Sequence, residues 1–462
     1  MLWILGLCVA QAGSEPSFVD RTQDVGLSIS GEGACWVDID NDGFPDLCAG
    51  GAVWKNHAGR RFSKVADVGA VVAADFDNDG FADLYSWNQR KLYKNNQGKS
   101  FSEVPLPKME GVSRGACWGD FDNDGFVDLY VGGFEDWEKQ LTYPSYVLKN
   151  VRGSRFEIVR TEAKWRTRGV TASDYDQDGD LDVYASNYRL MPNQLWSSSD
   201  WKDLAAERNA IATSTGFGGG HSIGAAWGDF DNDGLIDLFA GNFAHVDSRG
   251  DQPKSRFLRN LGAAGGWKFD DLGTCGVFYQ ESYASPAAGD YDNDGDLDLF
   301  FTTVYADASF GKKNYPVLYR NDGKFSFADA TAGAGLSQLA PTYQAAWADF
   351  DRDGDLELVT AGKLFVNRSQ RGTWLQMELR GDGRKVNRSA IGAQVRIKVG
   401  GKTLTRQVEA GTGEGNQNDL VLHFGLGGHQ GPLDAVITWP GGASQKVRIK
   451  EVNQKVEVLY KQ

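Results

Sequence analysis

The chain has 462 residues, of which 41% are hydrophobic and 12% aromatic, so it has ample material for a core and is not a disordered chain. Its 62 acidic and 48 basic residues leave a formal net charge of −14, which argues against a nucleic-acid-binding protein because such proteins are basic. Five cysteines in this length do not indicate a disulfide scaffold, and 58 glycines against 12 prolines indicate many tight turns.

Residues 1–12 have the pattern of a secretory signal peptide. Residues 2–9 form an apolar run, and Ala10-Gln11-Ala12 places small residues before a cleavage point at Gly13. No Lys or Arg lies between Met1 and that run, so an ordinary N-terminal tail is the alternative. With a signal, we expect a secreted or cell-envelope protein (periplasm or cell surface). No later segment approaches the ~18 apolar residues of a transmembrane helix, so none is expected.

A nine-residue pattern of the form DxDxDGxx(D/E) occurs seven times. The copies are DIDNDGFPD, DFDNDGFAD, DFDNDGFVD, DYDQDGDLD, DFDNDGLID, DYDNDGDLD and DFDRDGDLE, and we call them loops 1 to 7. Successive copies begin 37 to 61 residues apart. A constant segment at variable spacing predicts one structural unit that is repeated with connections of different length.

The chemistry of this pattern indicates calcium binding. Carboxylates at positions 1, 3, 5 and 9 and the main-chain carbonyl at position 7 make a cage of hard oxygen ligands for Ca²⁺. The glycine at position 6 permits the sharp turn that the cage needs. An EF-hand starts in the same way but requires a glutamate at position 12 and flanking helices, whereas here position 9 closes the site and β-prone residues follow. We therefore expect about seven Ca²⁺ ions, each bound in a loop between two strands.

Each loop contributes five expected calcium ligands, at positions 1, 3, 5, 7 and 9. In loops 1 to 3 they are Asp38, Asp40, Asp42, Phe44 and Asp46; Asp75, Asp77, Asp79, Phe81 and Asp83; and Asp120, Asp122, Asp124, Phe126 and Asp128. In loops 4 and 5 they are Asp174, Asp176, Asp178, Asp180 and Asp182; and Asp229, Asp231, Asp233, Leu235 and Asp237. In loops 6 and 7 they are Asp290, Asp292, Asp294, Asp296 and Asp298; and Asp349, Asp351, Asp353, Asp355 and Glu357.

The sequence around each loop predicts a four-stranded unit. A segment such as GACWVD or GAAWGD precedes the loop, and a β-prone segment follows it. A second motif comes next, as VWKN, KLYKN, YVLKN, RFLRN, VLYRN or KLFVN, and a further strand rich in Phe or Trp usually completes the unit. Seven such units predict an all-β fold, a seven-bladed β-propeller with calcium-binding hairpin loops over residues 13–370.

The start of the chain is expected to close this ring. The last repeat ends near Ser369 without an outer strand, while FVDRTQDVGL from Phe18 resembles FADATAGAGL from Phe327 in the sixth repeat. Phe18–Asp20 is therefore predicted to be the outer strand of the seventh blade, where it would cover an open sheet edge.

These repeats resemble the FG-GAP/VCBS family, whose propellers include that of the integrin α-subunit head. The resemblance covers residues 18–369 and places the family's calcium ligands on the loops named above. The departure is Glu357, which stands where the other six loops have aspartate. Its longer side chain can still act as a ligand in an altered site.

Residues 371–462 contain no such loop and alternate as TWLQMEL, AQVRIKV, DAVITWP and KVEVLY, which predicts a small β-sandwich-like domain. NRSAIGAQVRI, EAGTGEGN, LHFGLG and VITWPGG together resemble the ASPIC/UnbV domain. That family implies an extracellular or envelope protein and supplies no established chemistry.

The most promising binding surface lies on the face opposite the calcium loops. Long insertions at 134–146, 187–194, 242–255 and 305–316 are expected there, and they carry Trp137, Tyr188, Arg189, His245 and Tyr305. Tolerated insertions without a role are the alternative. We expect a non-catalytic binding or adhesion-type protein with an unknown protein or glycan ligand on this face. The alternatives are a calcium-assisted carbohydrate-active enzyme of the polysaccharide lyase type and a purely structural envelope protein.

Other patterns have simpler explanations. Trp36, Trp118, Trp227 and Trp347 recur before the loops and are expected to pack blades together, and His423 is expected to be structural. A small buried position is the simpler explanation of Cys35, and a bridge between Cys35 and Cys48 across one hairpin is the less favoured alternative. The string Arg249-Gly250-Asp251 is explained by chance in a chain rich in Gly and Asp.

Overall fold

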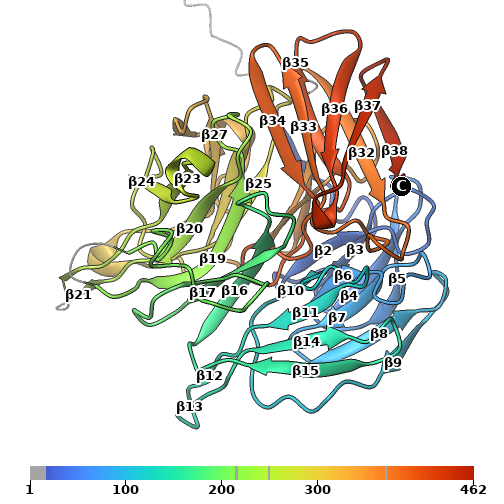
Figure 1. Ribbon diagram of the computed structural model, residues 1–462. Coiled ribbons are helices and arrows are strands. Elements are labelled where there is room, and N and C mark those ends of the chain that lie inside the picture. Colours follow the sequence, from blue (N-terminus) through green and yellow to red (C-terminus); the bar gives the residue numbers. More distant parts are fainter. Residues whose placement is uncertain (1–16, 214–216, 248–249, 370–371, 462) are drawn as a thin grey trace, which may run out of the picture.

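The computed structural model describes residues 17–213, 217–247, 250–369 and 372–461, and its regular structure is nearly all β-strand. Within these residues, seven antiparallel sheets follow one another, each built around one acidic loop, which confirms the predicted seven-bladed propeller (Figure 1). The expected signal peptide at 1–12 and Arg249 lie outside the described residues.

The blades are numbered like the loops. Blades 1 and 2 contain β2 (Ala34–Val37), β3 (Asp46–Ala49), β4 (Ala52–Asn56), β5 (Phe62–Asp67), β6 (Val71–Ala74), β7 (Asp83–Ser86), β8 (Lys91–Asn95) and β9 (Phe101–Val104). Blades 3 and 4 contain β10 (Ala116–Gly119), β11 (Asp128–Val131), β14 (Tyr146–Asn150), β15 (Phe156–Thr161), β16 (Thr167–Ser173), β17 (Asp182–Asn187) and β18 (Gln194–Trp196). Blades 5 and 6 contain β19 (His221–Gly228), β20 (Asp237–Phe243), β23 (Arg256–Asn260), β24 (Phe269–Gly273), β25 (Tyr283–Gly289), β26 (Asp298–Thr303), β27 (Val317–Asn321) and β28 (Phe327–Asp329). Blade 7 contains β29 (Ala345–Ala348), β30 (Glu357–Thr360), β31 (Lys363–Asn367) and β1 (Phe18–Asp20).

The first strand of each blade faces the centre, and these seven strands contact one another in a closed ring that returns from β29 to β2. The recurring tryptophans join neighbouring blades, as expected. Trp36, Trp118 and Trp347 are fully buried, and each indole N–H donates to a carbonyl of the preceding blade. A large ring at the blade boundary therefore buries apolar surface and also satisfies a main-chain acceptor.

The N-terminal strand closes the ring as predicted. β1 pairs antiparallel with β31, so that Phe18 lies opposite Asn367 and Asp20 opposite Phe365. The Phe18 side chain is buried, with its ring centroid 5.8 Å from that of Tyr291 and 6.1 Å from that of Trp347. The first described strand is thus part of the last blade.

Blade 4 departs from the predicted four strands, because its sheet has only β16, β17 and β18. The sequence after β18 is SSSDW, which lacks the Asn and Gly that turn the chain in the other repeats. The chain instead runs through turns at 199–209, with one isolated bridge between Trp196 and Asp203. Leu204, Ala205 and Ala210 are buried there and cover the sheet in place of an outer strand.

The C-terminal residues form two sheets of the expected sandwich-like domain. One has the order β35-β32-β38, with β32 and β38 parallel, and the other β34-β33-β36-β37. The strands are β32 (Thr373–Arg380), β33 (Gln394–Val399), β34 (Lys402–Gln407), β35 (Leu422–Gly427), β36 (Leu433–Thr438), β37 (Ser444–Ile449) and β38 (Gln454–Leu459).

This domain stands on one face of the ring, and the short hairpin of β12 (Glu135–Asp136) and β13 (Leu141–Thr142) projects from the other (Figure 1). A second short hairpin, β21 (Val246–Asp247) and β22 (Gly250–Asp251), belongs to the insertion of blade 5. Among the described residues, the helical segments are η1 (Ala263–Gly265), η2 (Ser309–Gly311), α1 (Thr331–Ala334) and η3 (Pro440–Gly442), all far too short to cross a membrane.

Candidate functional site

Each acidic loop is shaped by its own carboxylates. In loop 2, the backbone N–H of Gly80 donates to Asp75 Oδ2 at 2.7 Å, and that of Phe81 donates to Asp79 Oδ1 at 3.0 Å. The same two bonds recur in all seven loops. Gly80 has φ +96°, a conformation that favours glycine and explains why position 6 is glycine in every copy.

The position 9 carboxylate ties the loop to the sheet. Asp83 accepts the N–H of Phe76 at 3.1 Å on one oxygen and that of Asn95 at 2.7 Å on the other. In loop 7, Glu357 accepts the corresponding N–H groups of Phe350 and Asn367 at 3.2 and 3.4 Å. The longer side chain therefore occupies the place of aspartate and keeps both partners.

The carboxylates of a loop converge on one point. In each of loops 1 to 5, three carboxylate oxygens lie within 4.8 Å of one another. They belong to Asp38, Asp40 and Asp42; Asp75, Asp77 and Asp83; Asp120, Asp122 and Asp124; Asp174, Asp176 and Asp178; and Asp229, Asp231 and Asp237. Within the described part of the chain, Oδ1 at position 3 is buried without a hydrogen-bond partner in five loops, on Asp40, Asp77, Asp176, Asp231 and Asp351.

Burial of these carboxylates in the charged form is unfavourable without a bound cation. Burial, with a smaller contribution from neighbouring aspartates, raises the pKa of Asp75, Asp120 and Asp349 to about 7. Burial likewise raises the pKa of Asp46 to about 8 and that of Asp83 to about 9. Carboxyl groups whose pKa lies so far above its ordinary value need either a proton or a bound cation.

The residues of the loops fit Ca²⁺. The grouped donors among the described residues are carboxylate oxygens, with no nitrogen or sulfur atom among them, and this is the donor type that the hard cation Ca²⁺ prefers. The carbonyl at position 7 stays a predicted ligand. The unpartnered Oδ1 atoms supply acceptors that nothing else among the described residues satisfies. The seven loops expected from the sequence thus present seven similar oxygen cages around one face of the ring.

The asparagine of the second motif joins neighbouring loops, a role that was not predicted from the sequence. Asn95 donates from Nδ2 to the carbonyl of Ala82 in its own loop at 2.9 Å and to that of Ile39 in the preceding loop at 2.7 Å. The same pair of bonds is made by Asn56, Asn150, Asn260, Asn321 and Asn367. Only blade 4 has Ser198 at this place. The recurring KN or RN dipeptide was the available signal.

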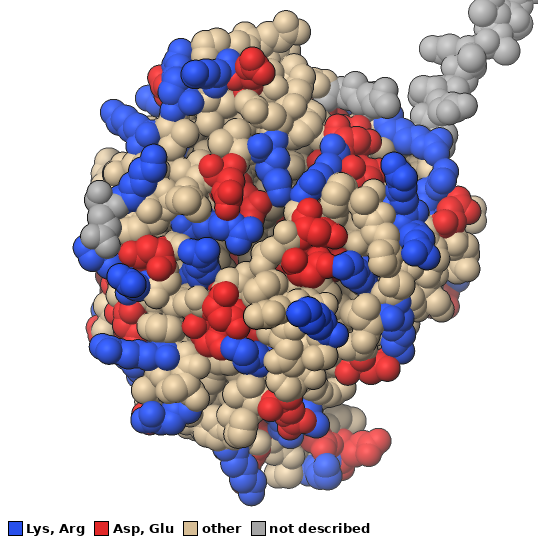
Figure 2. All heavy atoms as spheres, turned by 90° about the vertical axis from the view of Figure 1, so that its right-hand side faces the viewer, with Lys and Arg blue, Asp and Glu red and all other residues tan. Residues whose placement is uncertain are grey.

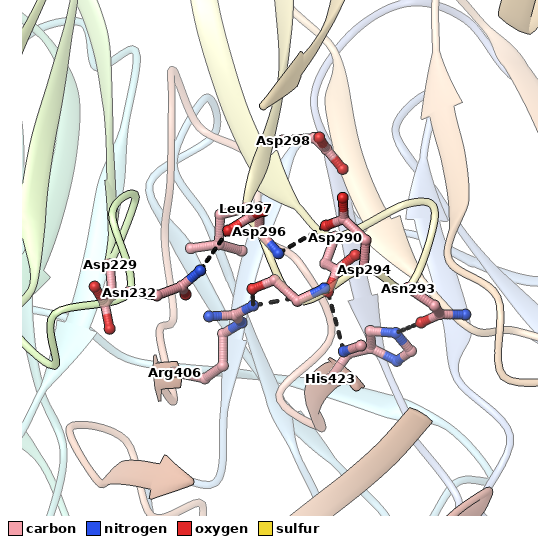
Figure 3. A network of polar contacts seen from close by, with 12 residues as sticks. Asp229, Asn232, Asp290, Asn293, Asp294, Asp296, Leu297, Asp298, Arg406 and His423 are labelled. Atoms are coloured by element: carbon pink, nitrogen blue, oxygen red, sulfur yellow. Dashed lines mark hydrogen bonds and ion pairs between the residues drawn. The ribbon is translucent and has the colours of Figure 1, made fainter. Parts of the chain in front are cut away.

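The C-terminal domain covers part of the loop face, which the sequence did not indicate. It donates to the position 1 carboxylates of three loops, from Thr405 N to Asp229, from Gly425 N to Asp290 and from Gln376 Nε2 to Asp349, at 2.7 to 3.1 Å. Figure 3 shows Arg406 and His423 reaching loop 6, where Arg406 Nη2 donates to the carbonyl of Gly295 at 3.3 Å. His423 lies 2.7 Å from Asn293 Oδ1, which gives it the structural role expected of it.

Residues 409–418 of this domain enter the centre of the ring. Main-chain hydrogen bonds of 2.8 to 3.0 Å join this segment to the innermost strands of blades 1, 3 and 5, through Gln417 and Ala34, Ala410 and Trp118, and Gly413 and Ala225. Gly413 has φ +57°, and a Cβ there would lie 2.1 Å from Ser285 Oγ. Glycine is therefore required in this part of the EAGTGEGN motif.

The tip of this segment connects with the opposite face. Glu414 Oε1 accepts from Arg168 Nε at 3.1 Å and Nη2 at 2.7 Å, and both side chains are buried. The Arg168 guanidinium lies over the rings of Phe134, Tyr188 and Tyr343, 4.9 to 5.3 Å from their centroids.

The insertion face brings together all five residues that the sequence analysis placed there. Arg189 donates to Glu135 at 2.7 and 2.9 Å and lies 4.1 Å above the ring of Trp137, whose surface is 60% exposed. The contacts continue from Tyr188 to His221, from His221 to His245, from His245 to Phe243 and from Phe243 to Tyr305, with centroid separations of 4.4 to 5.4 Å. We call Trp137, Tyr188, Arg189, His221, Phe243, His245 and Tyr305 the insertion cluster.

The polar side chains of the cluster contact neighbouring polar groups. His245 Nδ1 lies 3.2 Å from Glu281 Oε1, and the N–H of Ser309 donates to Glu281 Oε2 at 2.7 Å. Arg189 and His245 belong to different blades, and each has its own carboxylate partner. The cluster is a continuous set of aromatic contacts that is partly buried, since His221 and Phe243 are buried while Trp137 is exposed. Among the described residues of the cluster, Arg189 and His245 have separate carboxylate partners and do not converge on one point.

Comparison with known proteins agrees with the order of these parts. The profile described as FG-GAP-like repeat matches residues 75–131, 229–301 and 290–360, and these segments contain five of the seven loops. The profile described as ASPIC and UnbV matches residues 383–462. The chain carries FG-GAP-like repeats and an ASPIC/UnbV domain. The repeats form the ring, and the ASPIC/UnbV domain covers part of its loop face.

Curated relatives have the name cartilage acidic protein 1. The mouse protein is 29% identical over 255 residues, which cover 52% of this chain and 38% of the mouse protein, and the human protein is 28% identical over 253 residues, 52% and 36% of the two chains. This chain thus spans well under half the length of these relatives. A crystal structure of BBS1N in complex with ARL6DN is similar over 77% of this chain and 99% of the other, at 10% identity and a TM-score of 0.45.

Proposed function

We propose that this chain is an exported, calcium-stabilised propeller that binds a protein or glycan ligand through its insertion face and catalyses no reaction. The observation that carries the proposal is the buried, unpartnered Oδ1 at position 3, repeated in five loops of one geometry among the described residues. Cages of this kind have calcium affinities typical of extracellular modules, roughly 10⁻⁴ to 10⁻³ M, so they are filled where calcium is abundant. Export agrees with the signal-like residues 1–12.

Metal analysis tests the calcium half of the proposal. Protein dialysed to equilibrium against free calcium about tenfold above the expected Kd should hold close to one ion per loop in excess of the calcium in the surrounding buffer, so about seven in total. Asp231→Ala removes one position 3 ligand and should lower the count by one while leaving the other loops filled. Two or fewer ions in the saturated wild-type protein would overturn calcium binding by the repeats.

The insertion cluster supports the binding half. Trp137 is a large exposed ring on a short hairpin, and Arg189 is fixed beside it by Glu135, so a partner meets a preformed surface with little ordering cost. A glycan array and a screen against extracellular matrix proteins should yield a ligand whose binding Trp137→Ala weakens at least tenfold. Val159→Ala is the matched control, because Val159 is equally exposed but lies on β15, the outer strand of blade 3.

A lyase assay separates this proposal from the enzymatic alternative. Uronic-acid polymers incubated with the calcium-loaded protein should show no rise in absorbance from unsaturated products. Product formation that His245→Ala abolishes would overturn the non-catalytic assignment, and would make the pair of His245 and Glu281 the first candidate for a base.

A further inference from the structure

The residue before the second-motif asparagine differs between blades, and where it is basic it can contact the acidic loop of its own blade. In blades 1, 2, 3 and 5 it is basic and forms an ion pair with the position 3 aspartate of its own loop. The pairs are Lys55 with Asp40, Lys94 with Asp77, Lys149 with Asp122 and Arg259 with Asp231. On the side of the molecule seen in Figure 2, groups of acidic side chains have Lys or Arg beside them.

The basic side chain and a metal ion would use different oxygens of the same carboxylate. Lys55, Lys94 and Arg259 each contact Oδ2, while Oδ1 of Asp40, Asp77 and Asp231 is buried without a hydrogen-bond partner. Two of these side chains also reach the position 5 aspartate, Lys94 to Asp79 at 2.9 Å and Arg259 to Asp233 at 3.1 Å. The positive charge is therefore resident at the edge of the cage and does not block it.

Loops 4 and 7 have no such charge. Ser197 and Val366 occupy this place in their blades, and the ion pairs of the described residues include none to Asp176, Asp178, Asp351 or Asp353. Asp176 and Asp351 nevertheless have the same buried, unpartnered Oδ1. Loop 7 is the clearer case, because Arg208 and Arg396 act on loop 4 from a longer distance. Loop 6 belongs to neither class, since Arg320 pairs with Asp322 while Lys402 pairs with Asp296.

We infer that the loops form two calcium-affinity classes, set by this resident side chain. The inference rests on the proposed calcium binding. A unit positive charge a few ångströms from a divalent ion at a partly exposed site weakens binding on the order of tenfold. Loops 4 and 7 then bind calcium most tightly. Loops 1, 2, 3 and 5 fill later and release their ions first, and in each of these four loops the resident Lys or Arg still neutralises one carboxylate after the ion has left.

Counting ions by native mass spectrometry at stepped free calcium tests the inference. The wild-type protein should pass through a population with two ions at calcium concentrations about tenfold below those that fill the four paired loops. Lys94→Met keeps the aliphatic stem and should move one ion to the early group. Val366→Lys adds the charge at loop 7 and should move one ion to the late group. Lys91→Met is the control, because Lys91 lies on the same strand but pairs with Glu103.

The outcomes separate the inference from the proposed function. If saturated protein holds about seven ions but neither Lys94→Met nor Val366→Lys shifts the order of filling, the two classes do not exist. A shift of the same size in Lys91→Met would also overturn them, because it would mean that net charge alone is at work. A saturated count of two or fewer overturns calcium binding itself. Melting temperatures of each variant in saturating calcium show that it is folded, and Lys94→Met decides the case should Val366→Lys not fold.

Discussion

The two faces of the ring differ in how their residues are arranged. The loop face repeats one nine-residue geometry seven times, its carboxylates are bound by neighbouring backbone amides, and the C-terminal domain covers part of it. The insertion face consists of connections of different length, and its aromatic and charged residues come from several blades. One face thus holds the ring together, while the other can vary without disturbing it.

Charge compensation shows the same contrast. On the insertion face, Arg189 has Glu135 as a local partner, and the His245 ring lies beside Glu281. On the loop face, carboxylates outnumber their basic partners, and the pKa of most position 1 and position 9 groups is raised by burial. The loop face is therefore expected to depend on calcium, whereas the insertion face is not.

Removal of calcium should destabilise the loop face much more than the insertion face. At ten times its Kd, each bound ion stabilises the folded state by roughly 1.4 kcal/mol, and the effects of several loops add. Chelation should lower the melting temperature steeply, and hydrogen exchange should rise in the loops more than in the β12–β13 hairpin. Magnesium should restore little, because it resists dehydration and requires octahedral geometry. An unchanged melting curve in chelator would contradict the structural role of calcium.

Loss of the ion pair between Glu414 and Arg168, which connects the two faces, should have the next largest effect on stability. Glu414→Gln leaves Arg168 buried without its counter-charge, and loss of one partner of a buried pair typically costs about 3–5 kcal/mol. Urea unfolding should show this loss in saturating calcium. Glu138→Gln, an exposed change on the insertion hairpin, is the control and should stay within about 0.5 kcal/mol of wild type.

Opening the ring affects both faces together. Phe18→Ala removes a buried ring from blade 7 and should cost about 3 kcal/mol in denaturant unfolding. Deleting residues 13–24 removes the whole closing strand, and the exposed edge of β31 should then promote self-association, which size-exclusion chromatography would detect. A truncation that starts at Leu27 and keeps wild-type stability as a monomer would show that β1 does not close the ring.

The contact between the loop face and the C-terminal domain should be sensitive to acid. Burial, with the Arg406 charge, lowers the pKa of His423 to about 3. Below pH 6.5, His423 binds a proton in the unfolded chain but not in the folded chain. The contribution of His423 to the free energy of unfolding is therefore fully present above that pH and falls as the pH drops towards 3. The slope is at most about 1.4 kcal/mol per pH unit. In saturating calcium, His423→Gln should lose less stability than wild type between pH 6.5 and 4, and equal slopes would contradict the assignment.

A change on the insertion face should affect the stability of the ring least of all. Trp137→Ala changes an exposed side chain of the insertion cluster and should alter the free energy of unfolding by less than about 0.5 kcal/mol. Calcium stoichiometry should also stay unchanged. A large loss of stability would mean that the insertion face contributes to the ring and is not a separate binding surface.

Local features of the chain could be predicted well. The ligands of a loop lie within nine residues, so their spacing alone indicates the cage, the turn at glycine and the strands on either side. The closing strand was visible because FVD at Phe18 repeats a motif that blade 7 lacks. Blade 4 was the exception, since the prediction extended the common pattern to a repeat that has Ser198 where the others have asparagine.

The contacts of the C-terminal domain could not be predicted in this way. Asn416 accepts from the N–H of Ala34, 382 residues away, and no local pattern reports such a pair. The EAGTGEGN motif was noticed only as a resemblance, and its glycines became explicable once Gly413 was seen beside Ser285 in the centre of the ring. The insertion cluster was expected residue by residue, but its continuity depends on His221 and Phe243, which no pattern had singled out.

The sequence by itself determined the repeated blade, the acidic cage in each loop and the strand that completes the seventh blade, because these depend on short-range spacing and on hydrogen bonds between neighbouring residues. Only the tertiary structure decided which loops have a resident positive charge, which position 1 carboxylates accept hydrogen bonds from the second domain, and what fills the centre of the ring. These depend on where side chains from distant segments meet, and that is settled by the closure of the ring and the burial it imposes.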